Sequence, residues 1–101
     1  MDEATLKGIL DTTHLPVAYH HWNTPPALPY IVYLFIGSEN FGADNKVYVK
    51  ANNYNIELYS EIKDPASELL IENALDTADI FYYKTETWIE SENLYQITYE
   101  I

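Results

Sequence analysis

Alternation of apolar and polar residues near the end of the sequence is the strongest constraint on the fold. In Leu94–Ile101 the odd-numbered residues are Tyr, Ile, Tyr and Ile, and the residues between them are Gln, Thr and Glu. A period of two is typical of a β-strand with one buried face. Tyr30–Ile36 is apolar throughout, which favours a central strand covered on both faces. The sequence therefore predicts a sheet that contains both segments.

Lys46–Tyr59 predicts another long strand, but its apolar positions change phase along the way. They are odd-numbered at first and even-numbered later: Val47 and Val49, then Tyr54, Ile56 and Leu58. Because the side chains of a strand alternate between its faces, the core-facing set must change sides near Asn52 and Asn53. This predicts either a β-bulge at that point or a strand that leaves the sheet and projects as a hairpin arm.

Two segments have the signals of helices. Asp2–Leu10 carries acids in its first turn, where they favour the positive end of the helix dipole, and it places Leu6, Ile9 and Leu10 on one face. Asp64 and Pro65 suit the N-cap and the first position of a second helix, which we expect to end at about Asp79. The predicted buried stripe of this helix is Ala66, Leu70, Ile71, Ala74, Leu75 and Ala78. Its other side would be an acidic ridge without lysine partners, made of Glu68, Glu72 and Asp76.

Shorter segments complete the predicted fold. Pro16 favours a short edge strand over Val17–Trp22, before a loop that contains three prolines. Ile80–Thr85 and Leu94–Ile101 predict a hairpin whose connection is Thr87–Asn93. We therefore predict a single α+β domain over residues 1–101 in the order α-β-β-β-α-β-β. It has a largely antiparallel or mixed sheet of four to five strands, two helices packed on one face, and a long hairpin arm.

Length and composition limit the class of protein. A chain of 101 residues buries roughly two-thirds of its unfolded surface, so it can form a core without disulfides. It contains no cysteine, which excludes disulfides and zinc–thiolate sites. The acidic segment MDEATLKG lacks the apolar region of a secretory leader, and the longest apolar run is too short to cross a bilayer. We expect a soluble protein with no membrane partner.

The charge balance argues against nucleic-acid binding. Sixteen acidic residues face five lysines and no arginine, and the formal net charge is −11. A protein that neutralises phosphates needs a basic surface, and base recognition by bidentate arginine is impossible here. Acidity is nevertheless compatible with an inhibitor that imitates DNA and binds a host nucleic-acid-binding protein, and this remains an alternative function.

The polar stretch SENFGADNKVYV, from Ser38 to Val49, allows three interpretations: a calcium loop, a hairpin connection or a protein-binding surface. Its oxygen-bearing residues do not have the spacing of a calcium loop, because Phe41, Gly42 and Ala43 interrupt them. A hairpin connection is the better structural interpretation, with Gly42 and Asn45 at positions of positive φ.

The sequence has no catalytic constellation. No nucleophile elbow or phosphate-binding glycine loop is present. His20 and His21 are adjacent on a predicted strand, so we expect them on opposite faces and unable to share a metal, while His14 lies alone. Glu86, Glu90 and Glu92 lie close together in the sequence and could include an acid/base pair, but such clusters are expected by chance in so acidic a chain. We expect no enzyme activity, no cofactor and no metal.

Four segments carry a resemblance to a known family. They are LPYIVYL (Leu28–Leu34), ADNKVY (Ala43–Tyr48), NYNIELYS (Asn53–Ser60) and TETWIESENLYQITYEI (Thr85–Ile101). In this order they resemble small phage and prophage proteins of Gram-positive hosts. Those proteins are similar to tail-completion proteins, which are the tail terminators or tail-to-head joining proteins of long-tailed phages. The resemblance covers most of the chain from Leu28 onward, and head-closure or minor capsid neck proteins remain alternatives.

The resemblance implies a structural protein that forms a ring, expected to be a hexamer. Such a ring caps the tail tube and contacts the tail-tube protein and the head-connector protein. It assembles in the host cytoplasm and resides at the head–tail junction of the virion. We expect the subunit or tail-tube interface to include Glu39, Asn40, Phe41, Asp44, Tyr48 and Trp88. Glu68, Glu72 and Asp76 would face the lumen, where acids repel passing DNA.

Overall fold

The computed structural model describes the backbone of residues 1–43 and 46–101, and the side chains of residues 1–39 and 51–101. Its helices are α1 (Glu3–Asp11) and α2 (Pro65–Thr77). Its strands are β1 (Val17–Tyr19), β2 (Tyr30–Ala43), β3 (Lys46–Ser60), β4 (Tyr83–Ile89) and β5 (Leu94–Glu100), and a 3-10 turn, η1, covers Glu90–Glu92. The predicted α+β class and element order are confirmed.

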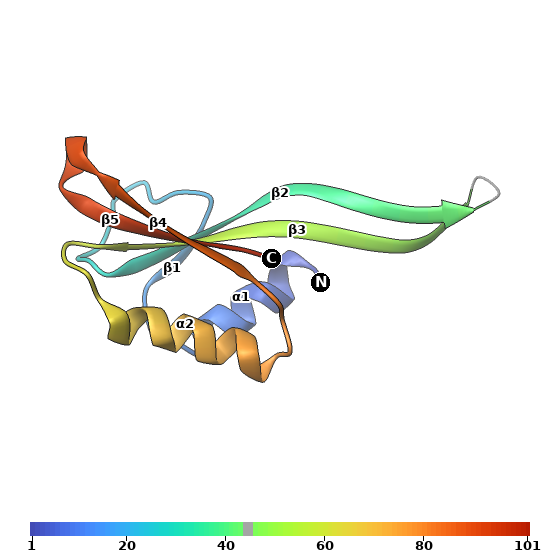
Figure 1. The fold of residues 1–101 in the computed structure, drawn as a ribbon, viewed down its shortest axis with the longest axis horizontal. Helices are drawn as coiled ribbons and strands as arrows, with labels where there is room; N and C mark the ends of the chain where they lie inside the picture. Colours follow the sequence, from blue (N-terminus) through green and yellow to red (C-terminus); the bar gives the residue numbers. More distant parts are fainter. Residues whose placement is uncertain (44–45) are drawn as a thin grey trace.

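The five strands form one mixed sheet in the order β1-β2-β3-β5-β4. β1 is parallel to β2, whereas the other neighbouring pairs are antiparallel. β3 and β4 therefore point the same way, with β5 between them, and α2 makes the crossover from one to the other. Both helices lie against the same face of the sheet, as predicted (Figure 1).

The core lies between the helices and that face of the sheet. Register partners on β3 and β5, such as Leu58 with Ile97 and Ile56 with Tyr99, present their side chains to it. The buried residues of the core are Leu6, Leu10, Ile31, Tyr33, Tyr54, Ile56, Leu58, Ile71, Leu75, Ile97 and Tyr99. Val32 is buried on the opposite face, so the central part of Tyr30–Ile36 is covered on both sides as predicted.

Side-chain caps explain where the helices begin. Asp2 Oδ1 accepts a hydrogen bond from the Thr5 amide at 2.8 Å, and Asp64 Oδ1 accepts one from the Ser67 amide at 3.1 Å. Each cap satisfies a backbone donor that has no partner inside its helix. The predicted start of α2 at Asp64 and Pro65 is confirmed.

The predicted buried stripe of α2 is wrong in part. The buried residues of this helix are Ser67, Glu68, Ile71 and Leu75. Ala66, Leu70 and Ala78 are instead exposed, and Ala74 is half-buried. The helix is rotated relative to the prediction because Glu68 faces inward, where lysines outside the helix neutralise it.

The last hairpin is displaced along the chain from the predicted position. The strand expected over Ile80–Thr85 is β4, which covers Tyr83–Ile89. It begins later than predicted because Ile80 still belongs to the end of α2, where its amide donates to the Leu75 carbonyl at 2.9 Å. The connection is shorter than Thr87–Asn93, since Trp88 still pairs with Tyr95 and their rings lie 4.8 Å apart. Asn93, with φ of 52°, closes the turn.

Candidate interaction surface

β2 and β3 continue well beyond the rest of the sheet. β3 pairs with β5 only over Asn55–Ser60, with one further backbone pair between Tyr54 and Ile101. β1 pairs with β2 only over Ile31–Tyr33. Within the described chain, Gly37–Ala43 and Lys46–Asn53 therefore pair only with each other, and we call these two segments the arm. Figure 1 shows the arm projecting past both helices.

The dimensions of the molecule reflect this projection. The radius of gyration is 14.9 Å, whereas a compact domain of this length has about 13 Å. The arm predicted from the phase change is therefore confirmed.

A β-bulge marks the base of the arm. Phe35 pairs with Tyr54 and Gly37 with Asn53, so Ile36 has no partner on β3. The predicted bulge therefore lies at the expected position along the strand pair, opposite Asn53. Its extra residue, however, belongs to β2 and not to the Asn52–Asn53 segment of β3. Gly37 has φ of 154°, a conformation that suits glycine. A second register shift lies between Phe41 and Gly42.

The stretch SENFGADNKVYV is mostly strand and not loop. Ser38–Ala43 belongs to β2 and Lys46–Val49 to β3, while Asp44 and Asn45 lie outside the described residues. Glu39 is exposed and pairs with Ala51. Asn40, Phe41 and Tyr48 belong to the arm strands, but their side chains also lie outside the description. Gly42, expected in the turn, belongs to β2, and the positive φ expected of Asn45 lies outside the described residues.

An exposed apolar cluster lies where the arm leaves the body. A shallow depression of about 330 Å³ is lined by Ile36, Phe81, Tyr83 and Ile101, which we call the root patch, and by the polar residues Glu39, Asn53 and Glu100. Ile101 is the partly buried member, since it also packs against the core. Phe81 is 74% exposed and Tyr83 65% exposed, and their rings meet edge to face at 5.0 Å. The sequence does not predict this cluster, because the apolar character of Phe81 and Tyr83 gives no sign that they are exposed.

Trp88 is not brought together with the other predicted interface residues. It is partly exposed on β4 and packs against Tyr95. Tyr83 begins β4 on the arm side, since it pairs with Glu100. Trp88 lies five positions after Tyr83 along the strand, or roughly 17 Å away. A surface that includes both Trp88 and the arm must therefore extend along the whole of β4.

The prediction that the acidic ridge of α2 has no lysine partners is wrong. Glu68 is only 3% exposed, and its carboxylate lies 2.7 Å from Lys63 Nζ and 2.7 Å from Lys84 Nζ. Lys84 also contacts Glu72 at 2.9 Å, and Lys63 contacts Glu86 at 2.6 Å. Glu68 is too buried to face a lumen, and Glu72 is neutralised by β4. Of the three acids, only Asp76 is exposed.

The ion-pair network shifts the acidities of its members. Burial alone would raise the pKa of Glu68, but hydrogen bonds from Lys63 and Lys84 outweigh it and lower that pKa. Hydrogen bonds to Glu68 and Glu86 raise the pKa of Lys63 to about 12. Burial, and the hydrogen bond that Tyr99 donates to Glu72 at 2.8 Å, raise the pKa of the Tyr99 hydroxyl. With its pKa lowered, Glu68 stays ionised at neutral pH, and with theirs raised, Lys63 and Lys84 stay protonated. Their ion pairs therefore fasten α2 to the sheet.

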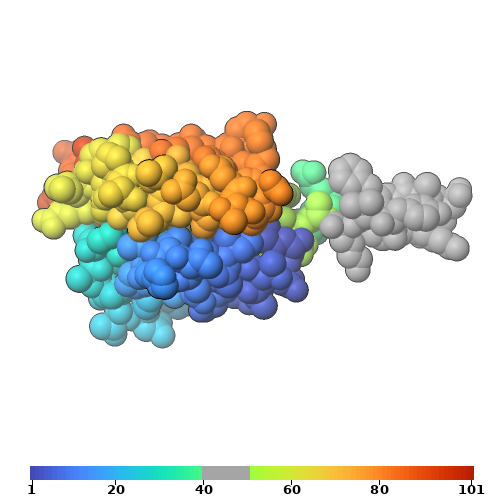
Figure 2. Space-filling view, turned by 90° about the horizontal axis from the view of Figure 1, so that it is seen from below, coloured from blue at the N-terminus to red at the C-terminus, as the bar shows by residue number. Residues whose placement is uncertain are grey.

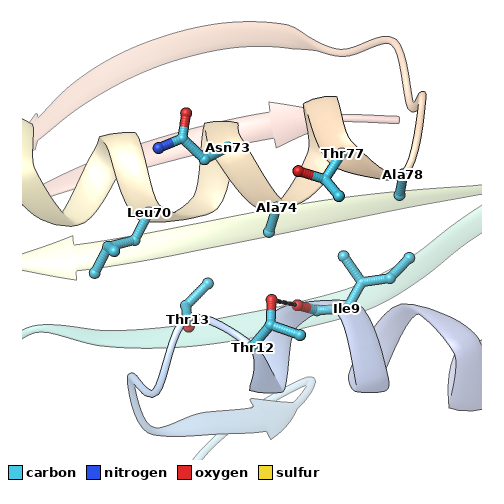
Figure 3. A pocket seen from close by; sticks show the side chains of 8 residues that line it. All are labelled: Ile9, Thr12, Thr13, Leu70, Asn73, Ala74, Thr77 and Ala78. Carbon is cyan, nitrogen blue, oxygen red and sulfur yellow. Dashed lines mark hydrogen bonds between the residues drawn. The ribbon is translucent and has the colours of Figure 1, made fainter.

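A groove of about 440 Å³ runs between the two helices. α1 and α2 lie side by side over the sheet in Figure 2. The groove is lined by Ile9, Thr12, Thr13, Leu70, Asn73, Ala74, Thr77 and Ala78, drawn in Figure 3. Thr12 hydroxyl donates to the Ile9 carbonyl at 2.6 Å, so it is already used within α1. None of the lining side chains ionises near neutral pH, and the groove therefore offers no acid or base for catalysis.

The adjacent histidines are arranged differently from the prediction. β1 ends at Tyr19, and His20 has φ of 69°. The His21 amide donates to the Tyr19 carbonyl at 2.8 Å, which makes His20 the centre of a γ-turn. Such a turn is strained for a residue with a side chain, by about 1–3 kcal/mol. It brings His20 Nδ1 and His21 Nδ1 to 3.2 Å, so the expectation of opposite faces is wrong.

Among the residues whose side chains are described, no group of three or more His, Asp or Glu is arranged to hold a metal ion. In the same part of the chain, no helix is both long and apolar enough to span a membrane. A scan against protein-family models and a search of the curated proteins both find no match to this chain.

Proposed function

We propose that this protein is a structural subunit of a phage head–tail junction. In this proposal it is a tail terminator that forms a ring, expected to be a hexamer, on the end of the tail tube. It binds the tail-tube protein on one side and the head-connector protein on the other. The proposal rests on the resemblance of the four strand and hairpin segments, and the arm is the structural observation that supports it most.

The arm has the properties of a segment that needs a partner. A two-stranded hairpin is marginally stable in water, because it lacks a further layer to cover it. Within the described chain the arm strands pair only with each other, so their outer edges offer backbone groups that can pair with another chain. In a closed ring each subunit offers one surface and accepts a different one, so an arm that reaches the neighbouring body suits this geometry.

The root patch supports a contact at the base of the arm. Phe81 and Tyr83 are large, apolar and mostly exposed, and aromatic residues are enriched in protein interfaces. Apolar side chains that gather on an exposed surface are one of the features of protein interaction sites. We place the root patch next to a neighbouring subunit or the tail-tube protein.

The charge of the chain suits a channel for DNA. A net charge of −11 on each subunit repels phosphates instead of binding them. This part of the proposal no longer depends on Glu68 or Glu72, because lysines neutralise both. Asp76 is the remaining candidate for a lumen-facing acid, and the proposal places assembly in the host cytoplasm and the finished ring in the virion.

The test is the mass of the purified protein in solution, with and without tail-tube protein. In the principal variant an Asn-Gly turn replaces residues 39–51 and joins Ser38 to Asn52, which are register partners. This sequence forms a tight hairpin turn, so the shortened strands remain paired. We expect the wild type to form a ring alone or on contact with tail-tube protein, and the variant to remain monomeric with its thermal transition retained.

Two point variants separate the arm from the root patch. Phe81→Ser removes the most exposed aromatic residue of the patch and should weaken assembly without changing stability by more than about 0.5 kcal/mol. Ile62→Ser is the matched control, since Ile62 is 72% exposed and lies outside both surfaces. A shortened variant that still forms rings would refute the role of the arm. A stable wild-type dimer that ignores tail-tube protein would refute the ring and favour the acidic-inhibitor alternative.

A further inference from the structure

We propose that His20 and His21 bind one divalent late transition-metal ion, such as Zn²⁺, Ni²⁺ or Cu²⁺, through their Nδ1 atoms. Imidazole nitrogen is a preferred ligand of these metals, whereas Mg²⁺ and Ca²⁺ prefer oxygen. The proposal is independent of the ring, because it concerns a different part of the surface.

The separation of the two nitrogens suits a shared metal. The Nδ1 atoms lie 3.2 Å apart, and the two rings are nearly perpendicular. A zinc–nitrogen bond is about 2.0–2.1 Å long, so a metal bonded to both atoms would make an angle of roughly 100° between them. That angle is close to the tetrahedral value. The same distance also allows an N–H···N hydrogen bond, and the experiment below distinguishes the two arrangements.

The backbone holds the two imidazoles in this arrangement at a cost. An extended strand would place consecutive side chains on opposite faces. The γ-turn at His20 prevents this, and it is fixed on both sides: the His20 amide donates to the Tyr33 carbonyl at 2.7 Å, and the His21 amide donates to Tyr19. Strained backbone of this kind is concentrated at functional sites. The strain here has one visible effect, which is to bring the two Nδ1 atoms together.

The surroundings admit a cation from solvent. Both histidines are exposed, and they line a depression of about 200 Å³ together with Trp22, Tyr30 and the acidic residue Glu92. No third residue completes a metal cluster among the described side chains, so water or a donor from another molecule would fill the remaining positions. The negative charge of the whole chain further attracts a divalent cation.

The test is an NMR titration of the histidine side chains with Zn²⁺ at neutral pH. The chain has three histidines, so the spectrum contains three sets of imidazole signals. We expect the signals of His20 and His21 to shift together and saturate at one equivalent, while the signals of His14 do not change. Cu²⁺ provides a second measurement, because nitrogen coordination is visible in its electron paramagnetic resonance spectrum.

Variants make the assignment specific. His20→Asn and His21→Asn should each weaken Zn²⁺ binding by about tenfold or more, as loss of an important group at a metal site commonly does. Asparagine tolerates positive φ, so the turn at His20 should persist. His14→Asn is the matched control and should bind as the wild type does. Equal response of all three histidines, no response at one equivalent, or unchanged binding in both variants would overturn the proposal.

Discussion

Replacing Glu68 with glutamine isolates the contribution of one buried carboxylate to the stability of the fold. Its side chain is almost completely buried, and its carboxylate lies 2.7 Å from the Nζ atoms of Lys63, before α2, and of Lys84, on β4. Glutamine preserves the shape of the side chain but removes its charge. The change therefore tests the ion pairs with little disturbance of the packing.

The expected loss is about 2 kcal/mol of unfolding free energy. A hydrogen bond to a charged group contributes roughly 1.5–3 kcal/mol. Two such bonds are weakened here, but the removal of the charge also relieves the cost of burying it. Lys63 and Lys84 are partly exposed and regain water when the carboxylate is gone. For a domain of about 100 residues, this loss lowers the melting temperature by roughly 10 °C.

The effect should depend on pH in one direction. The pKa of Glu68 in the folded protein is below its ordinary value of 4.5. A lowered folded-state pKa contributes stability above the unfolded-state pKa, and this stability is lost as pH falls through the folded-state value. Glutamine does not titrate. The difference in unfolding free energy between the wild type and Glu68→Gln should therefore be largest at neutral pH. It should shrink as the pH falls below 4.5.

Urea unfolding followed by circular dichroism, at neutral pH and at about pH 3, measures this difference. Asp76→Asn is the matched control, because Asp76 is an exposed acid on the same helix, and its replacement should change stability by less than about 0.5 kcal/mol. The reasoning fails if Glu68→Gln equals the wild type at neutral pH. It also fails if the difference is unchanged in acid.

Two further predictions concern α2. Ile71→Ala should lower the free energy of unfolding, measured in urea, by about 2–5 kcal/mol, because Ile71 is fully buried. Leu70→Ser should lower it by less than about 1 kcal/mol, because Leu70 is exposed. A cost at Leu70 as large as that at Ile71 would mean that Leu70 is buried, as the sequence predicts, and would contradict the rotation seen in the structure. Asp64→Ala should lower stability by about 1 kcal/mol through loss of the cap on the Ser67 amide, measured by thermal unfolding; an unchanged melting temperature would show that the cap is dispensable.

Features set by neighbouring residues were predictable from the sequence. The start of α2 was clear because Asp64 and Pro65 act within one turn of the helix. The arm was predictable because a strand has a fixed period of two, so the phase change in Lys46–Tyr59 had to appear as a change of environment. The alternation in Leu94–Ile101 likewise gave the correct face of β5, since Ile97 and Tyr99 are buried.

Features set by distant residues were not predictable in this way. The rotation of α2 depends on Lys84, which reaches Glu68 from a strand later in the chain. The exposure of Phe81 and Tyr83 depends on the place of β4 at the edge of the sheet, which their apolar character does not reveal. The histidine arrangement depends on a single dihedral angle at His20, and histidine gives only a weak signal for positive φ.

The place of β5 has a consequence for how the chain acquires its structure. β5 follows β4 in the sequence but lies between β3 and β4 in the sheet. During synthesis, the residues up to Ile89 can form only the β1-β2-β3 part of the sheet, and β4 has no strand to join until Leu94–Glu100 has emerged. Ile97 and Tyr99 then enter the core last. The step that closes the core is therefore the pairing of β5, within the β4–β5 hairpin, with the distant strand β3. Pairing between segments far apart in the sequence is slow.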